Sequence, residues 1–162
     1  MRIDLSLTEW HHAVQTGLLR MVVSSASQLN HASTYKRTWD KRLQEEVTGA
    51  AAEIAVAKSV GAFCIGSVNT FHRVPDVIGG TEVRATQRED GCLIVRDNDA
   101  DDRRYVLVTG EAPNLRIAGY LYGHEAKQPQ WLRNPHGHRE AWFVPQAALH
   151  DWSEFVATDV AA

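Results

Sequence analysis

The hydrophobic period of this chain changes once, near Gly61, and that change constrains the fold more than any other feature. Before Gly61, apolar residues recur at the spacing of an α-helix. After it, apolar runs are short and β-type, and turn residues separate them. This order predicts a single α/β or α+β domain with N-terminal helices, a central mixed β-sheet that includes a meander, and flanking helices.

Two helices are predicted before the change. Ser6-Leu7-Thr8-Glu9 has the S-x-x-E form of a capping box, so the first helix is expected to begin there. Its apolar stripe has a four-residue spacing and consists of Trp10, Val14, Leu18 and Val22. The second helix is predicted over 35–60, with Gly61 as its stop. Its expected buried face consists of Trp39, Leu43, Val47, Ala51 and Ile54.

Five short strands are predicted after the change, over 74–77, 82–86, 92–96, 105–109 and 115–122. Turn residues separate them at Gly79-Gly80, at Asp90-Gly91 and in the acidic run 97–102. A short helix within 123–132, a last strand over 141–144 and a helix from Pro145 to Val156 complete the pattern. Residues 1–162 are therefore interpreted as one domain, with a helical extension over 1–48, a core over 49–144 and a C-terminal helix over 145–162.

The composition excludes several classes of protein. Hydrophobic residues make up 44% and charged residues 23% of the chain, which argues against a disordered, collagenous or disulfide-scaffold protein. No apolar run approaches the roughly 18 residues that a membrane span needs. Two isolated cysteines, Cys64 and Cys92, suit a reducing compartment. We therefore expect a soluble, cytoplasmic protein with no membrane partner.

The charge balance bears on nucleic acid. A net charge of −3, from 17 basic and 20 acidic residues, argues against a protein that coats nucleic acid non-specifically, but it does not exclude an enzyme that acts on it. Basic residues gather in the first third of the chain. They form either a solvated helix face or a track for phosphate groups, and both interpretations stay open. The candidate nucleic-acid-binding residues are Arg20, Lys36, Arg37, Lys41, Arg42 and Arg88.

Acidic residues on neighbouring elements suggest a metal site. Asp76 lies at the end of one predicted strand, and Glu82 and Arg84 leave the same face of the next because they are two residues apart. A tight turn between the strands would bring Asp76 towards Glu82. Two carboxylates beside a cation suit Mg²⁺ or Mn²⁺; the alternative is an exposed hairpin with an ordinary ion pair. Glu53, among alanines on the second helix, is either a third acid of the site or a solvated residue.

A second acidic pattern is set aside. Asp97-x-Asp99-x-Asp101 has the opening spacing of an EF-hand calcium loop. Asp102 stands at the sixth position, where a glycine is required, and Val108 at the twelfth, where a glutamate should be. A solvated hairpin tip is therefore expected.

The acids and their order resemble the core of the PD-(D/E)XK nucleases. The resemblance rests on Gly49-Ala50-Ala51-Ala52-Glu53 in a helix, Pro75-Asp76 at a strand end and Glu82-Val83-Arg84 on the next strand. It covers about 49–144, and its later part is similar to small nuclease-like proteins often encoded by bacteriophages. It implies a restriction-endonuclease-like core and a Mg²⁺-dependent deoxyribonuclease, at work inside a bacterial host.

The resemblance also implies roles for single residues. Asp76, Glu82 and the Val83 backbone carbonyl would hold Mg²⁺ or Mn²⁺, with Glu53 reaching the metal directly or through water. Arg84 stands where the family has lysine; it keeps the positive charge for the scissile phosphate but does not release a proton near neutral pH.

Three functions therefore stay open. The first is a metal-dependent nuclease that hydrolyses DNA, and the second is a nuclease-fold module that binds nucleic acid or a protein partner without cutting. The third is a structural or inhibitory module that uses the same surface as a protein interface. The form of the DNA and the pairing of two copies into a homodimer also stay open.

Overall fold

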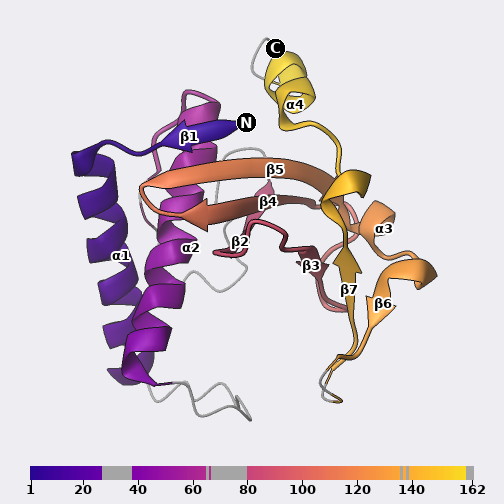
Figure 1. The fold of residues 1–162 in the computed structure, drawn as a ribbon, viewed down its shortest axis with the longest axis horizontal. Coiled ribbons are helices and arrows are strands. Elements are labelled where there is room, and N and C mark those ends of the chain that lie inside the picture. The colour runs from indigo at the N-terminus through magenta and orange to yellow at the C-terminus, as the bar shows by residue number, and fades with distance from the viewer. Residues whose placement is uncertain (27–37, 65, 67–79, 136, 138, 160–162) are drawn as a thin grey trace.

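The computed structural model describes residues 1–26, 38–64, 66, 80–135, 137 and 139–159 (Figure 1). These residues form a mixed α+β fold, as the sequence predicts. The helices are α1 (Leu7–Ala26), α2 (Trp39–Ser59), α3 (Gly123–Ala126) and α4 (Trp152–Asp159), with 3₁₀ turns at Pro129–Trp131 and Gln146–Ala148. The strands are β1 (Arg2–Asp4), β2 (Thr81–Thr86), β3 (Leu93–Val95), β4 (Arg104–Glu111), β5 (Asn114–Tyr122), β6 (Leu132–Arg133) and β7 (Ala141–Val144).

The described strands form two sheets. The larger has the order β1-β5-β4-β2, in which β2 and β4 are parallel and the other pairs are antiparallel. The smaller has the order β3-β7-β6 and is antiparallel. The run 92–96, predicted as part of a meander, therefore pairs with β7 instead of with its sequence neighbours. Because β2 and β4 are parallel, the chain between them must cross back along the sheet, and β3 lies on that crossover.

The first helix begins as its sequence predicts. The backbone N–H of Ser6 donates to Glu9 Oε2 at 2.7 Å, and the N–H of Glu9 donates to Ser6 Oγ at 3.3 Å. These two bonds satisfy donors that the first turn of a helix cannot pair internally. The capping box is therefore confirmed.

Three residues of the predicted apolar stripe of α1 face outward, whereas the fourth, Trp10, is half-buried. Val14, Leu18 and Val22 are 37%, 42% and 51% exposed, whereas the side that packs on α2 has small residues such as Ala13 and Gly17. A four-residue spacing identifies a stripe but does not say which side of the helix meets a neighbour. The two helices approach each other so closely that only small side chains fit between them, so the side of α1 with small residues faces α2.

The buried part of α2 lies in its second half. Ala51 and Ile54 are buried as predicted, and Leu43 and Val47 are half-buried. Trp39, predicted on the buried face, is 62% exposed, because it is the first residue of α2 and lies beyond the packed middle of the helix.

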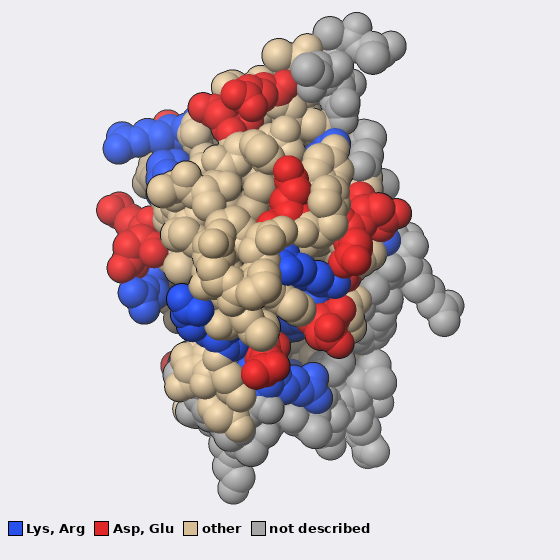
Figure 2. Space-filling view, turned by 90° about the vertical axis from the view of Figure 1, so that its right-hand side faces the viewer, with Lys and Arg blue, Asp and Glu red and all other residues tan. Residues whose placement is uncertain are grey.

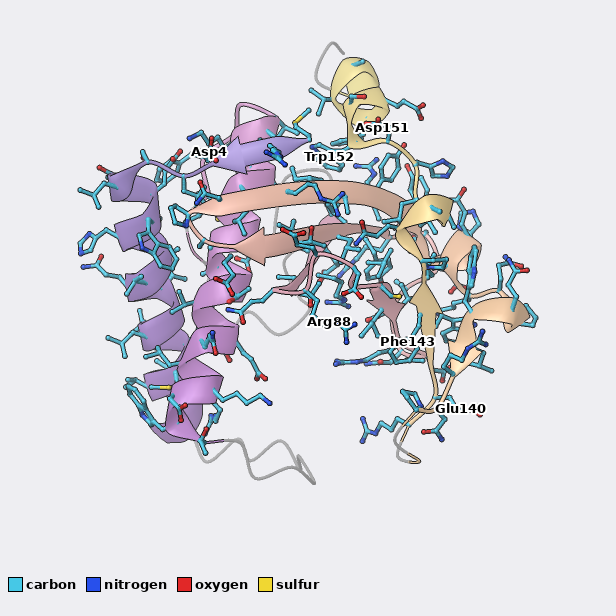
Figure 3. All side chains as sticks on the ribbon, viewed as in Figure 1. Asp4, Arg88, Glu140, Phe143, Asp151 and Trp152 are labelled. Atoms are coloured by element: carbon cyan, nitrogen blue, oxygen red, sulfur yellow. The ribbon has the colours of Figure 1, made fainter. Side chains whose placement is uncertain are left out.

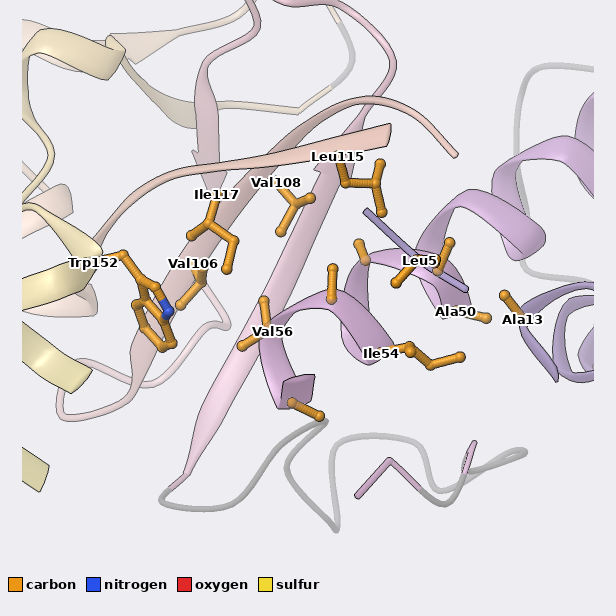
Figure 4. Packing of buried hydrophobic residues seen from close by; sticks show 14 of the residues in the cluster. Leu5, Ala13, Ala50, Ile54, Val56, Val106, Val108, Leu115, Ile117 and Trp152 are labelled. Carbon is orange, nitrogen blue, oxygen red and sulfur yellow. The ribbon is translucent and has the colours of Figure 1, made fainter. Parts of the chain in front are cut away.

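Two hydrophobic clusters cover the two faces of the larger sheet. In the first, the alanine-rich half of α2 packs against Val106 and Val108 of β4, together with β5 and Trp152 (Figure 4). In the second, Tyr105 and Leu107 of β4 pack against the smaller sheet. Successive side chains of a strand point to opposite faces, so β4 contributes to both clusters. The larger sheet therefore lies between α2 and the smaller sheet.

The C-terminal part differs from its prediction in one element. The strand over 141–144 and the short helix after Gly123 are present, whereas Pro145 precedes only a 3₁₀ turn. The turn ends because His150 continues in extended form and pairs with Tyr120, and α4 begins at Trp152. No helix in the described ranges is long and apolar enough to cross a membrane.

Candidate functional site

The strand β2 presents Glu82 and Arg84 on one face, as their spacing predicts. Glu82 lies opposite Tyr105 in the parallel ladder and Arg84 opposite Leu107, so both side chains point towards the second cluster and the smaller sheet. Val83, between them, packs on the first cluster beneath α2.

Glu82 is buried and its charge is compensated by arginines. Arg103 Nη1 donates to Glu82 Oε1 at 2.5 Å, and Arg84 Nη1 lies 4.0 Å from Glu82 Oε2. A carboxylate this far from water is tolerated only where cations and hydrogen bonds replace the lost hydration. Arg103 was not singled out by the sequence, because no local pattern connects it with Glu82.

Arg84 is held by a second acid that the sequence interpretation missed. Its Nη2 donates to both carboxylate oxygens of Asp99, at 2.9 and 3.0 Å, and its guanidinium lies 5.3 Å from the ring centre of Tyr105. Asp99 is buried, and its Oδ2 also accepts from the backbone N–H of Arg96 at 2.8 Å. The expectation of a solvated hairpin tip is therefore wrong at Asp99.

The loop around Asp99 encloses a lysine. Lys127 Nζ lies 2.6 Å from the Asp99 carbonyl, 3.2 Å from the Asp97 carbonyl and 2.6 Å from Asp101 Oδ1. The repeated aspartates therefore surround an ammonium group, which fixes the loop that positions Asp99.

Tyr105 lies beneath Arg84 and stays protonated at neutral pH. Burial, followed by the negative charge of Asp99, raises the pKa of the Tyr105 phenol to about 12. Its hydroxyl donates to the Ala100 carbonyl at 3.2 Å. Tyr105 therefore supports the loop and does not accept a proton near neutral pH.

Glu53 is buried on α2 and pairs with Arg20 of α1. Arg20 Nη1 and Nη2 donate to Glu53 Oε1 and Oε2, each at 2.7 Å. The interpretation of Glu53 as a solvated residue is therefore wrong. Glu53 also belongs to a helix that covers the face of the sheet opposite to the face that Glu82 occupies.

The remaining candidate residues differ in what the structure says of them. Lys41 and Arg42 are exposed on the first turns of α2, and Arg42 Nη2 donates to Ser24 Oγ at 3.2 Å. Gln44 Nε2, one turn further on, donates to Gln87 Oε1 at 3.2 Å, so this end of α2 lies beside the end of β2. Three candidates lie outside the described residues: Lys36, Arg37 and Asp76.

A cleft of about 430 Å³ opens at the end of β2, between the two sheets. Arg84, Arg88 and Arg96 line it, and the acid among its lining residues is Asp90. Figure 3 labels Arg88 beside β2 and Phe143 on β7, the two sides from which the lining comes. The cleft therefore combines arginines from β2, from the turn that follows it and from the end of β3.

The described carboxylates do not by themselves fit Mg²⁺ or Mn²⁺. Both oxygens of Glu53 accept from Arg20, and Glu82 accepts from Arg103. Within the described ranges, no group of three or more His, Cys, Asp or Glu side chains could hold a metal ion. The expected ligand Asp76 is not among those residues, so the ligand set predicted from the sequence is incomplete here.

The face that Figure 2 shows has no large surface patch of one sign of charge that could be an alternative site. There, Lys and Arg side chains alternate with Asp and Glu around an uncharged centre. Comparison with protein-family models, with curated proteins and with solved structures finds no match for this chain. The resemblance to PD-(D/E)XK nucleases therefore stays a prediction from the sequence.

Proposed function

We propose that this chain is a DNA-binding module that holds the phosphate backbone in the cleft at the end of β2 without hydrolysing it. The observation that supports this function is the convergence of Arg84, Arg88 and Arg96 on one cleft whose lining includes a single acid, Asp90. The planar fork of a guanidinium matches two oxygens of a phosphate, which makes arginine well suited to such a site.

The three arginines differ in how readily they meet a phosphate. Arg96 is exposed and forms no ion pair with any described residue. Arg88 pairs with Asp90 at 3.0 Å, but both side chains are exposed, and such pairs contribute little to stability. Arg84 is fixed by Asp99 and supplies a rigid positive edge. Arg88 and Arg96 can change their positions, whereas Arg84 is held in place. This combination suits a cleft that a DNA strand must enter and leave.

The basic surface continues beyond the cleft. Lys41 lies one turn before Gln44 on α2, and Gln44 contacts Gln87, the neighbour of Arg88. A DNA strand in the cleft would therefore pass beside Lys41. The chain attracts phosphate locally in this way, although its net charge is −3.

A second candidate function is metal-dependent hydrolysis of DNA with Mg²⁺ or Mn²⁺. It is favoured by the placement of Glu82 and Arg84 on the same face of β2, with Arg84 also lining the cleft. The arginine partners of Glu82 and Glu53 argue against it, because a carboxylate that is already neutralised binds a cation less strongly. A binding function requires no rearrangement of these pairs.

The binding experiment measures fluorescence anisotropy of labelled DNA in EDTA at several salt concentrations. Changing Arg88 and Arg96 together to Ala should weaken binding by tenfold or more and make the slope of log K against log salt shallower, by about 1.4 for a single strand or about 1.8 for a duplex, because two phosphate contacts are lost. The matched control is Arg2→Ala with Arg133→Ala, which removes two exposed arginines outside the cleft. Equal losses in the two double variants would contradict the proposal.

The hydrolysis experiment incubates the same DNA with the protein in Mg²⁺ or Mn²⁺ and examines the products on a gel. We expect binding without cleavage. Cleavage by the wild-type protein that disappears in Glu82→Ala would establish the second candidate function instead. Cleavage only in Arg84→Lys would show that the departure from the family's lysine is what prevents hydrolysis.

A further inference from the structure

The floor of the cleft is apolar, although its rim is basic. Ile94 on β3 and Phe143 on β7 are direct cross-strand partners, and both line the cleft. Neighbouring residues at the same register of adjoining strands point to the same face of a sheet, so the two side chains form one apolar surface. Leu107 of β4, which is buried in the second cluster, also lines the cleft.

An apolar floor is not what a phosphate group requires. Ile94 is 37% exposed and Phe143 is half-buried, so the cleft leaves apolar area in contact with water. Exposing such area is unfavourable by about 25 cal/mol for each Å², and a ligand that covers it recovers that free energy. The ligand should therefore have a flat apolar face as well as negative charge. A nucleotide has both within one unit.

We propose that the cleft binds one unpaired nucleobase against Phe143 and Ile94, while its arginines hold the adjoining phosphates. The ligand is then single-stranded DNA or an unpaired strand end, because the bases of an intact duplex are stacked on one another and cannot reach the floor. This inference rests on the proposed function, since it specifies which form of DNA the same cleft accepts.

The size of the cleft agrees with this ligand. Its volume of about 430 Å³ is within the range of sites for small organic ligands. A ligand the size of one nucleotide is therefore compatible with the cleft.

The main experiment compares three labelled probes by fluorescence anisotropy: an eight-nucleotide oligo(dT), an abasic oligomer with the same number of phosphates, and a duplex of matched length. Stacking of one base on an aromatic ring changes affinity by about tenfold, so oligo(dT) should bind about ten times more tightly than the abasic oligomer. The duplex should bind no more tightly than the abasic oligomer. Phe143→Ala should remove the preference for oligo(dT), and Phe143→Trp should keep it.

The matched control is Phe63→Ala, because Phe63 is 80% exposed and lies outside the cleft. It should leave all three affinities unchanged. Phe143→Leu replaces the alanine variant if that variant does not fold, since leucine keeps the apolar volume and lacks the ring.

A second measurement uses the two cysteines. Cys92 is half-buried in the lining of the cleft, and Cys64 is half-buried outside it. Bound oligo(dT) should slow the alkylation of Cys92 severalfold, as followed by mass spectrometry, and should leave the alkylation rate of Cys64 unchanged.

The outcomes separate this inference from the proposed function. If oligo(dT) and the abasic oligomer bind equally well, or if the duplex binds most tightly, the inference is wrong and the DNA-binding function remains. If no probe binds at all, the proposed function is wrong as well. Protection of both cysteines, or of neither, would place a bound strand outside the cleft.

Discussion

At the scale of single residues, the buried acids are compensated by arginines from other elements. Glu53 meets Arg20 and Glu82 meets Arg103, in both cases at 2.7 Å or less. Removing one member of a buried pair leaves the other as an uncompensated charge, which is far more unfavourable than losing the pair as a whole. These acids therefore have a structural role in addition to any role at a site.

The Arg20–Glu53 pair leads to a prediction about stability. Glu53→Ala should lower the free energy of unfolding by about 3–5 kcal/mol, because Arg20 stays buried without this carboxylate. The double variant Arg20→Met with Glu53→Leu should lose less than the sum of the two single variants. Urea denaturation measures the wild type, Glu53→Ala, Arg20→Met, Glu53→Leu and the double variant, and Glu140→Ala, at an exposed position, should change the free energy by less than about 0.5 kcal/mol. Additive losses would contradict the importance of the pair.

Tyr105 leads to a prediction about pH. Burial raises its pKa in the folded protein to about 12, whereas a tyrosine in the unfolded chain ionises near pH 10. Its contribution to stability is therefore fully present below pH 10 and is lost as the pH rises from 10 towards 12. Melting temperatures of the wild type and of Tyr105→Phe should converge over this interval. A difference that stays constant from pH 9 to 12 would contradict the assignment.

At the scale of elements, α1 and α2 pack so closely that only a glycine fits at their contact. A Cβ added at Gly17 would lie 2.6 Å from the backbone nitrogen of Val47 and 2.7 Å from its Cα. Backbone atoms cannot move aside as the end of a flexible side chain can. The same contact explains why Val14, Leu18 and Val22 of α1 face outward.

Two glycine variants test this packing. Gly17→Ala should lower the free energy of unfolding by about 1–3 kcal/mol, because overpacking outweighs the better helix propensity of alanine. Gly49→Ala on α2 is the matched control: its added Cβ meets no atom within 4 Å, so it should raise the free energy of unfolding by up to about 1 kcal/mol. Chemical denaturation gives both values. A stabilised Gly17→Ala would show that the helices separate easily.

At the scale of the whole molecule, α4 connects the end of the chain to α2 across the first cluster. Trp152 is fully buried, and its Nε1 donates to Ser59 Oγ at 2.7 Å. Its ring centre lies 4.6 Å from that of Phe155 and 5.9 Å from that of Tyr120. The helix that ends in Ser59 and the strand that contains Tyr120 therefore meet on one side chain (Figure 4).

Trp152 should accordingly dominate the contribution of α4 to stability. Trp152→Ala should lower the free energy of unfolding by about 3–5 kcal/mol, through lost burial and a residual cavity, and Ser59→Ala by about 1 kcal/mol. Trp39→Ala, at an exposed tryptophan, should change it by less than about 0.5 kcal/mol. Thermal and urea unfolding check these values. A Trp39 variant as unstable as the Trp152 variant would contradict the packing described here.

The sequence alone determined the features that depend on neighbours a few residues apart. The capping box starts α1 because Ser6 and Glu9 lie within one turn, and the period of two places Glu82 and Arg84 on one face of β2. The last strand was predicted with its observed bounds, Ala141–Val144. A short apolar run between turns is a local signal for a strand. The α+β class follows from the same local periods.

Only the tertiary structure decided which groups meet. Arg20 and Glu53 are 33 residues apart, and Arg84 and Asp99 are 15 apart, so no spacing rule pairs them. The transfer of β3 to the smaller sheet and the outward face of α1 likewise depend on what each element packs against. Local sequence patterns predict the conformation of the backbone. Burial, the pairing of charges and the shape of a cleft instead depend on contacts between segments that are distant in the sequence. For that reason the sequence predicted the candidate acids, and the fold assigned their partners.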